Sequence, residues 1–145
     1  MCLGSSAIFR RAVLFLLLSG CILGAAMAQP VKDTASGAFT ADQAKRGENF
    51  YQQNCAACHG GALQGEEENP PLSGKHFSNR WGGLPVGVLF GFVNSQMPLG
   101  QPGSLGAQAN IDIVAYILSI NKFPAGQTEL PPDAKALGTI TINKQ

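Results

Sequence analysis

Residues 54–61 read NCAACHGG and place two cysteines and a histidine within five positions, Cys55 to His59. Residues three apart lie on the same side of a helical turn, so the thiols of Cys55 and Cys58 can face one partner. Three chemistries use such a cluster: covalent attachment of haem, a zinc site and a redox-active dithiol. The sequence on either side of the cluster has to decide between them.

The cluster follows directly on a predicted helix. Thr40 is placed to cap this helix, with Gln43 at the third helical position in a capping-box arrangement. Gly47 and Tyr51 lie on its inner face, which continues into Cys55. A glycine inside a helix costs about 1 kcal/mol relative to alanine. Gly47 therefore indicates either a second helix that crosses too closely for a side chain or a tolerated surface glycine.

The candidate for that second helix is residues 107–120, AQANIDIVAYILSI, which is apolar on most sides and must be buried. Shorter helices are predicted over 73–80 and 84–95. The segments between them are too rich in glycine and proline to form long elements. No internal repeat and no convincing strand is visible, so the sequence predicts an all-α domain.

The N-terminus has the pattern of an export signal. A short basic start precedes an apolar run, and an A-x-A-type site ends at Ala28, which predicts a signal peptide over 1–28 and a periplasmic mature chain. An alternative is the lipoprotein-like LSGC at 18–21, in which Cys21 would carry lipid. Only this second interpretation predicts a membrane anchor.

Removal of the predicted signal peptide changes the cysteine and methionine counts and the formal charge. Cys55 and Cys58 become the only cysteines, and Met97 becomes the only methionine. The formal charge falls from +1 to −1 because Arg10 and Arg11 are lost (+1 − 2 = −1). Such a chain has no basic field for nucleic acid, so no nucleic-acid partner is expected.

Of the three chemistries, haem attachment accounts for the cluster best. A structural zinc site usually takes four Cys or His ligands, and this one would need His76 from a different segment. A dithiol redox site normally follows a strand in a βαβ unit, and none is visible. Haem attachment uses every residue of the cluster, because both thiols add to vinyl groups and His59 ligates the iron. We therefore predict one covalent c-type haem.

Met97 is the predicted sixth ligand of the haem iron. It lies in a loop bounded by glycine and proline, with Pro98 directly after it. The alternative role for Met97 is that of an apolar gap-filler. His76 is the rival ligand, and its simpler interpretation is a surface side chain or one that contacts a haem propionate.

Together these residues resemble a known family, the class I monohaem cytochromes c. The similarity rests on five stretches in the family's order: GENFYQQNCAACHG, PPL at 70–72, MP at 97–98, PGSL at 102–105 and DIVAYIL at 112–118. The resemblance implies that the first and last helices cross nearly at right angles, with short helices and loops around one haem. The expected organisation is a leader at 29–39, a cytochrome c domain at 40–122 and an extended C-terminal tail at 123–145. That tail either wraps the domain or links it to a partner.

The resemblance also implies individual roles. The carbonyl of Pro70 would accept a hydrogen bond from the second ring nitrogen of His59, and Leu72 would pack on the haem face. Trp81, with Arg80 beside it, would either direct its indole N–H to a haem propionate or serve as a plain core residue. Gly47 and Tyr51 would pack against Tyr116 and its neighbours, where the two long helices cross.

The function expected from these features is one-electron transfer without bond chemistry, so the protein is not expected to be an enzyme. The stretch after residue 88 is similar to small cytochromes that accompany quinoprotein dehydrogenases. This similarity suggests a periplasmic dehydrogenase as electron donor, a quinoprotein being one candidate, and an oxidase or other redox protein as acceptor. The alternative is a haem peroxidase or gas-binding protein in which Met97 is a labile ligand.

Overall fold

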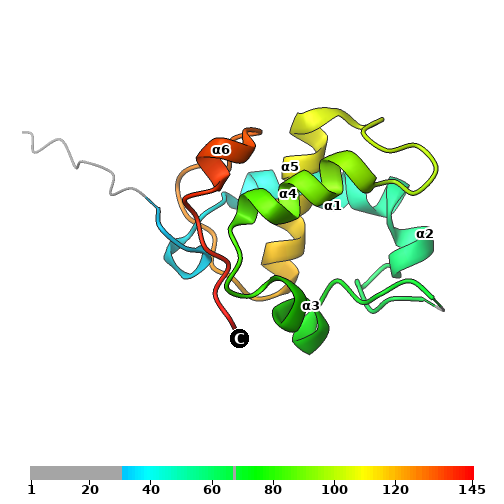
Figure 1. Ribbon diagram of the computed structural model, residues 1–145, viewed down its shortest axis with the longest axis horizontal. Helices are drawn as coiled ribbons and strands as arrows, with labels where there is room; N and C mark the ends of the chain where they lie inside the picture. Colours follow the sequence, from blue (N-terminus) through cyan, green and yellow to red (C-terminus); the bar gives the residue numbers. More distant parts are fainter. Residues whose placement is uncertain (1–30, 67) are drawn as a thin grey trace, which may run out of the picture.

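The computed structural model describes residues 31–66 and 68–145, and this part of the chain is helical with no strand (Figure 1). The predicted signal peptide over 1–28, including Cys21, lies outside the described residues. The elements in chain order are the 3₁₀ helix η1 Thr34–Ser36 and the helices α1 Ala41–Asn54, α2 Ala56–His59, α3 Gly74–Trp81, α4 Val86–Gln96, α5 Gly106–Ile120 and α6 Ala134–Leu137. The all-α fold is thus confirmed.

The start of α1 follows the sequence only in part. The Thr40 hydroxyl accepts a hydrogen bond from the Gln43 backbone N–H at 3.1 Å, as a cap should. The Gln43 side chain does not return to Thr40, and that half of the capping-box prediction is wrong. Instead its amide pairs with both backbone groups of Leu130, at 2.9 and 2.8 Å. Gln43 is fully buried there, where its amide needs a donor and an acceptor in place of water.

The crossing of α1 and α5 is the tightest contact of the fold. A Cβ atom built on Gly47 would lie 1.8 Å from the carbonyl oxygen of Asp112. Gly47 therefore marks a close helix crossing and is not a surface glycine. One turn further along, the rings of Tyr51 and Tyr116 pack with centroids 5.3 Å apart. The backbones approach closely enough that no side chain fits at position 47.

A buried carboxylate lies at the same crossing. The Asp112 side chain is only 1% exposed and accepts hydrogen bonds from Nε and Nη2 of Arg46 at 3.0 and 3.2 Å. Arg46 also donates to Glu129 at 3.0 and 2.8 Å, and these bonds hold the pKa of that carboxyl below its usual range. The network joins α1 and α5 to the segment that follows α5. A charge inside an otherwise apolar helix is thus paired, as burial requires.

The C-terminal segment, 123–145, packs on the domain and is not extended throughout. It contains α6, which lies against α4 so closely that a Cβ on Gly87 would be 2.6 Å from the Ala134 carbonyl oxygen. Thr141 forms isolated bridges with Asp33 and with Pro85. The core therefore extends beyond 40–122 on both sides, through the buried side chains of Thr34, Phe39, Leu130, Leu137 and Ile142.

None of the helices in residues 31–66 and 68–145 has both the length and the hydropathy needed to cross a membrane.

Candidate haem site

One apolar cavity of about 480 Å³ opens between α2, α3, α4 and the inner side of α5. Its volume lies within the range of small-molecule and cofactor sites, about 300–1,000 Å³. The cavity wall contains every site residue predicted from the sequence: Cys55, Cys58, His59, Pro70, Leu72, Arg80, Trp81 and Met97. These residues come from four separate segments of the chain, and His76 also lines the cavity.

The two cysteines lie where α1 passes into α2. Cys55 ends α1, with its backbone N–H bonded to the Tyr51 carbonyl at 2.8 Å, and α2 then carries Cys58 into the wall. Both thiols are free; Cys55 is half-buried and Cys58 is exposed. Burial, with a smaller contribution from Cys58, raises the pKa of Cys55 to about 11, so this free thiol is protonated at neutral pH.

His59 ends α2 and is oriented by a backbone carbonyl. Its Nδ1 lies 3.0 Å from the carbonyl oxygen of Pro70. A carbonyl only accepts hydrogen bonds, so Nδ1 carries the proton in this contact and the neutral ring keeps its lone pair on Nε2. Such a contact fixes the tautomer and orientation of a metal-ligating histidine. The pairing is the one that the resemblance implied.

Asn121, which the sequence reasoning missed, holds the segment that carries Pro70. Its side chain is buried, donates to the Leu72 carbonyl at 2.9 Å and accepts from the Gly74 N–H at 2.9 Å. The Leu72 N–H in turn donates to the Leu63 carbonyl at 3.0 Å. A polar residue directly after a buried, mainly apolar helix was the available signal, because such a residue must find partners when it is buried.

Met97 approaches the cavity from the end of α4. Its N–H donates to the Val93 carbonyl at 3.2 Å, and its own carbonyl accepts from Gly103 at 3.1 Å. Pro98 follows through a cis peptide bond. These bonds close the loop on itself and hold the half-buried Met97 side chain against the cavity.

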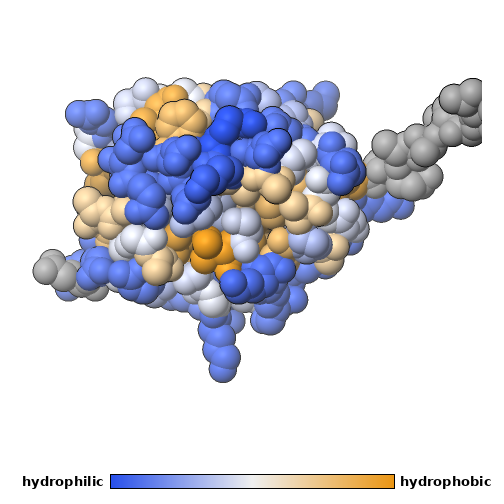
Figure 2. Space-filling model, turned by 180° about the vertical axis from the view of Figure 1, so that it is seen from behind, coloured by the Kyte–Doolittle hydropathy of each residue, from blue (hydrophilic) through white to orange (hydrophobic). Residues whose placement is uncertain are grey.

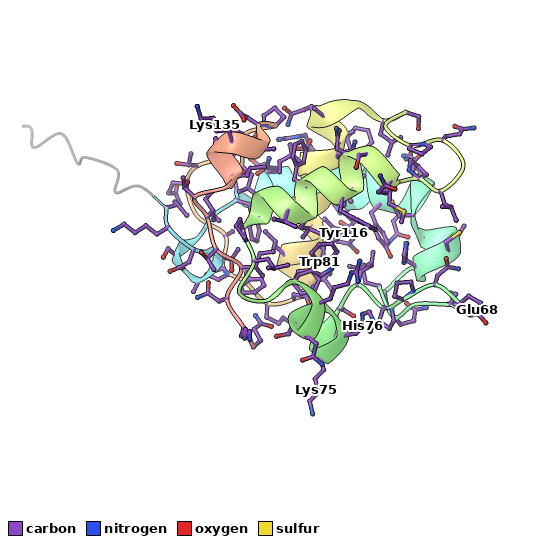
Figure 3. All side chains as sticks on the ribbon, viewed as in Figure 1. Glu68, Lys75, His76, Trp81, Tyr116 and Lys135 are labelled. Carbon is purple, nitrogen blue, oxygen red and sulfur yellow. The ribbon has the colours of Figure 1, made fainter. Side chains whose placement is uncertain are left out.

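An aromatic pair with a cation forms the α3 side of the cavity. Trp81 is 6% exposed and packs against Phe92, with ring centroids 5.6 Å apart. The guanidinium carbon of Arg80 lies 4.9 Å from the Trp81 ring and 5.5 Å from the Phe92 ring. In Figure 3, Trp81 lies toward the interior of the molecule, whereas Lys75 of the same helix points away from it. Because Arg80 stacks on both aromatic rings, its guanidinium is held at the edge of the apolar cavity.

The residues present fit a c-type haem. Two free thiols lie one helical turn apart, and the orientation of His59 leaves Nε2 able to ligate iron. Met97 adds a thioether, the other ligand that cytochromes c use. In the described part of the chain, no three His, Cys, Asp or Glu side chains gather into a metal-binding group. The apolar lining suits a flat macrocycle and includes Phe77, Leu89, Phe92, Ile113 and Ile117.

The all-α fold and this site define the class of protein as a monohaem cytochrome c with a covalently bound c-type haem. More narrowly, the chain belongs to the family described as cytochrome C oxidase, cbb3-type, subunit III, whose model matches residues 42–117, more than half of the chain. The matched region runs from the first turn of α1 into the last turn of α5 and contains all the cavity residues.

Curated relatives share this region with the chain. A thiosulfate dehydrogenase of Stutzerimonas stutzeri (strain A1501) is 35% identical over 80 residues, covering 51% of this chain and 26% of the relative. A thiosulfate dehydrogenase of Allochromatium vinosum is 34% identical over 80 residues, covering 50% of this chain and 30% of the relative. The chain thus matches between a quarter and a third of the length of these enzymes.

A solved structure shares the fold. The sulfane dehydrogenase SoxCD from Paracoccus pantotrophus superposes with a TM-score of 0.50 at 22% identity, over 70% of this chain and 60% of that chain. At this identity the likeness concerns the fold alone.

Proposed function

We propose that this protein is a periplasmic one-electron carrier whose haem is attached through Cys55 and Cys58 and ligated by His59 and Met97. The observation that carries the proposal is that all four side chains line one apolar cavity. The bound haem supplies a one-electron couple between ferric and ferrous iron. The protein would hold the haem, supply both iron ligands and limit the access of other molecules to the iron.

The ligand residues define a carrier. The bond from His59 Nδ1 to the Pro70 carbonyl holds the ring in one orientation and leaves Nε2 directed away from that carbonyl, as the iron ligand would have to be. A thioether such as that of Met97, paired with histidine, favours the reduced state and raises the reduction potential. When side chains supply both axial ligands, substrate has no free position on the metal. The chain would therefore pass electrons without bond chemistry.

Arg80 and Trp81 have a proposed role at the edge of the cavity. Haem carries two propionates, and a guanidinium held by stacking on Trp81 and Phe92 is placed to compensate a carboxylate charge. The exposed Cys58 marks the other edge, where a thioether-linked side of the macrocycle would reach the surface. This edge is the proposed route for electrons.

The proposed donor is a periplasmic dehydrogenase that oxidises a reduced sulfur compound, and the acceptor is an oxidase or another redox protein. The names of the curated relatives support this class of donor, because both relatives described above are thiosulfate dehydrogenases. A quinoprotein dehydrogenase, suggested by the sequence, is the competing donor class. Purification of the native protein with its partner would decide between the two classes.

Replacement of the sixth ligand tests the proposal. Met97→Ala should abolish the far-red sulfur-to-iron absorption band and convert the ferric haem to a high-spin form. Met97→His should remain low-spin but show a lower reduction potential, because histidine then replaces the thioether. If the far-red band persisted in Met97→Ala, the assignment of Met97 would be wrong.

A second candidate function rests on His76, which lines the same cavity as Met97. If Met97 dissociated readily, His76 would be placed to act as a distal acid–base group for a haem peroxidase or a gas-binding protein. The unmodified ferrous protein would then bind carbon monoxide rapidly, and His76→Ala would change the rate. A carrier with a firmly bound Met97 should bind carbon monoxide slowly and be unaffected by His76→Ala.

A further inference from the structure

Within the residues that the structure describes, two long stretches contain no Asp, Glu, Lys or Arg. They are residues 49–65, which include α2, and residues 81–111, which include α4 and the loop after it. The same chain carries ten Lys and Arg and nine Asp and Glu elsewhere. These are the two longest uncharged segments of the described residues, and the fold brings parts of them together.

They meet at a groove beside the haem cavity. Gln53 and Asn54, at the end of α1, form one side, and residues 98–105 form the other: Pro98, Leu99, Gly100, Gln101, Ser104 and Leu105. Asn54, Pro98 and Leu99 line both the groove and the cavity. We call the groove together with the neighbouring Cys58 edge of the cavity the uncharged face.

The uncharged face combines an exposed apolar side chain with uncharged polar ones. Leu99 is 85% exposed, the most exposed large apolar side chain of the described residues, and it lies at the junction of groove and cavity. Gln53 and Gln101 line the same groove, and their amides add no charge. Exposed apolar side chains beside uncharged polar ones are typical of a protein-docking surface.

Most charged groups lie on other surfaces; the exposed Glu66 and Glu68 are exceptions, because they follow α2, and Figure 3 shows Glu68 on the α2 side of the molecule. Asp42, Lys45, Arg46 and Glu48 belong to α1, and Figure 2, seen from the side on which α1 lies, shows a broad hydrophilic area. Arg80 and His76 line the α3 side of the cavity, away from the groove. No charged side chain lines the groove itself, whereas Arg80 lines the α3 side of the cavity.

We propose that the uncharged face is the docking surface for a redox partner protein whose own docking face is also uncharged. The inference rests on the proposed electron-transfer function, because it places the partner where Cys58 reaches the surface. A charged partner face would lose hydration here and gain no opposite charge in return. Electron-transfer encounters bury less than about 1,200 Å², an area that a groove and one exposed leucine can anchor.

Electron self-exchange tests this proposal with known components. A reduced and an oxidised copy of the haem-loaded protein carry the same uncharged face; one electron passes from the first to the second, and NMR line broadening gives the rate. Ionic strength from about 0.01 to 1 M shortens the Debye length from about 30 to 3 Å. The wild-type rate should change less than twofold over this range. A steep salt dependence would overturn the proposal.

Added charge sharpens the test. In a self-exchange complex, Gln101→Lys or Gln53→Lys brings two like charges together, one from each copy. Exchange should slow about fivefold at low salt, the repulsion of unit charges about 4 Å apart in water, and recover at about 1 M salt. Ala136→Lys is the matched control, because α6 lies on the opposite side of the molecule from α2 in Figure 1. Equal slowing by Ala136→Lys would overturn the proposal.

Other occupants of the face give different results. A stable dimer in sedimentation that Gln101→Lys dissociates would show that the face binds a second copy permanently. Co-sedimentation with neutral phosphatidylcholine vesicles, abolished by the same variant, would show that it binds lipid; either result overturns the proposal. Failure of the carrier function itself is seen separately, because absorption spectra and reduction potentials report the state of Met97 in every variant before exchange is measured.

Discussion

The α1–α5 crossing and the wall of the haem cavity are held in different ways. At the crossing, backbone touches backbone at Gly47, and the buried Asp112 carboxylate is paired with Arg46. At the cavity, helices α3, α4 and α5 supply apolar side chains, but the segment that carries Pro70 is held by individual hydrogen bonds, such as those with His59 and Asn121. The crossing is thus fixed by close packing of backbone on backbone, whereas the Pro70 side of the cavity depends on a few hydrogen bonds.

The largest loss of stability should come from adding a single methyl group at the helix crossing. Gly47→Ala places a methyl group 1.8 Å from the Asp112 carbonyl oxygen, so the two helices must move apart. Overpacking of this kind costs about 3 kcal/mol or more when backbone is the obstacle. Urea unfolding of the haem-loaded protein would measure the loss.

Gly91 provides the matched control, since it also lies inside a helix, α4. A Cβ there would meet no atom within 4 Å. Gly91→Ala should therefore stabilise the protein by up to about 1 kcal/mol through helix propensity. If both variants changed stability equally, close packing at Gly47 would not be what fixes the crossing.

A second and smaller effect concerns the contact between α1 and the C-terminal segment. Gln43→Leu keeps the volume but leaves the N–H and C=O of Leu130 without partners. Each buried polar group left unpaired costs about 1–3 kcal/mol, so a loss of about 2 kcal/mol is expected in urea. Hydrogen exchange at the Leu130 amide should also become faster. Thr40→Ala, which removes only the cap, should cost about 1 kcal/mol and leave that amide protected.

Much of the crossing could be predicted from local sequence. The 3.6-residue periodicity and the Thr40 cap placed α1, and the apolar run placed α5 close to its observed bounds. Gly47 indicated the crossing because an unfavourable residue in a helix needs a reason. The partner of Arg46 was not predicted, although a lone Asp112 in an apolar helix implies a buried cation nearby.

The C-terminal segment and the cavity wall were harder to predict. Gln43 and Leu130 are 87 positions apart, and no periodicity reports such a contact. The residues just before α3 belong to no helix, and they are held by Asn121, which lies far along the chain. The NCAACHGG cluster could be interpreted because its chemistry is local. The assignment of Met97 as a ligand stays a prediction.

A third prediction tests the cavity wall. Asn121→Ala removes the bonds to the Leu72 carbonyl and the Gly74 N–H, and should cost about 2 kcal/mol in urea. The segment carrying Pro70 would then hold His59 less firmly, so the reduction potential should also change. Gln43→Leu, which lies in the other region, should lower stability without moving the potential. An unchanged reduction potential in Asn121→Ala would mean that the segment held by Asn121 does not control the orientation of His59.

The smallest effect is expected at the exposed ion pair of Arg46 with Glu129. Arg46 lowers the pKa of Glu129 in the folded protein, so the pair stabilises fully above the unfolded pKa of about 4.3 and is lost as pH falls through the folded value. The Glu129 side chain is 43% exposed, so the contribution should stay below about 1 kcal/mol and shrink with salt. Glu129→Gln should therefore lower stability at pH 7 but not at about pH 3, measured by urea unfolding. An equal loss at both values would mean that Glu129 acts through packing or neutral hydrogen bonds, and that charge at the edge of the crossing contributes nothing.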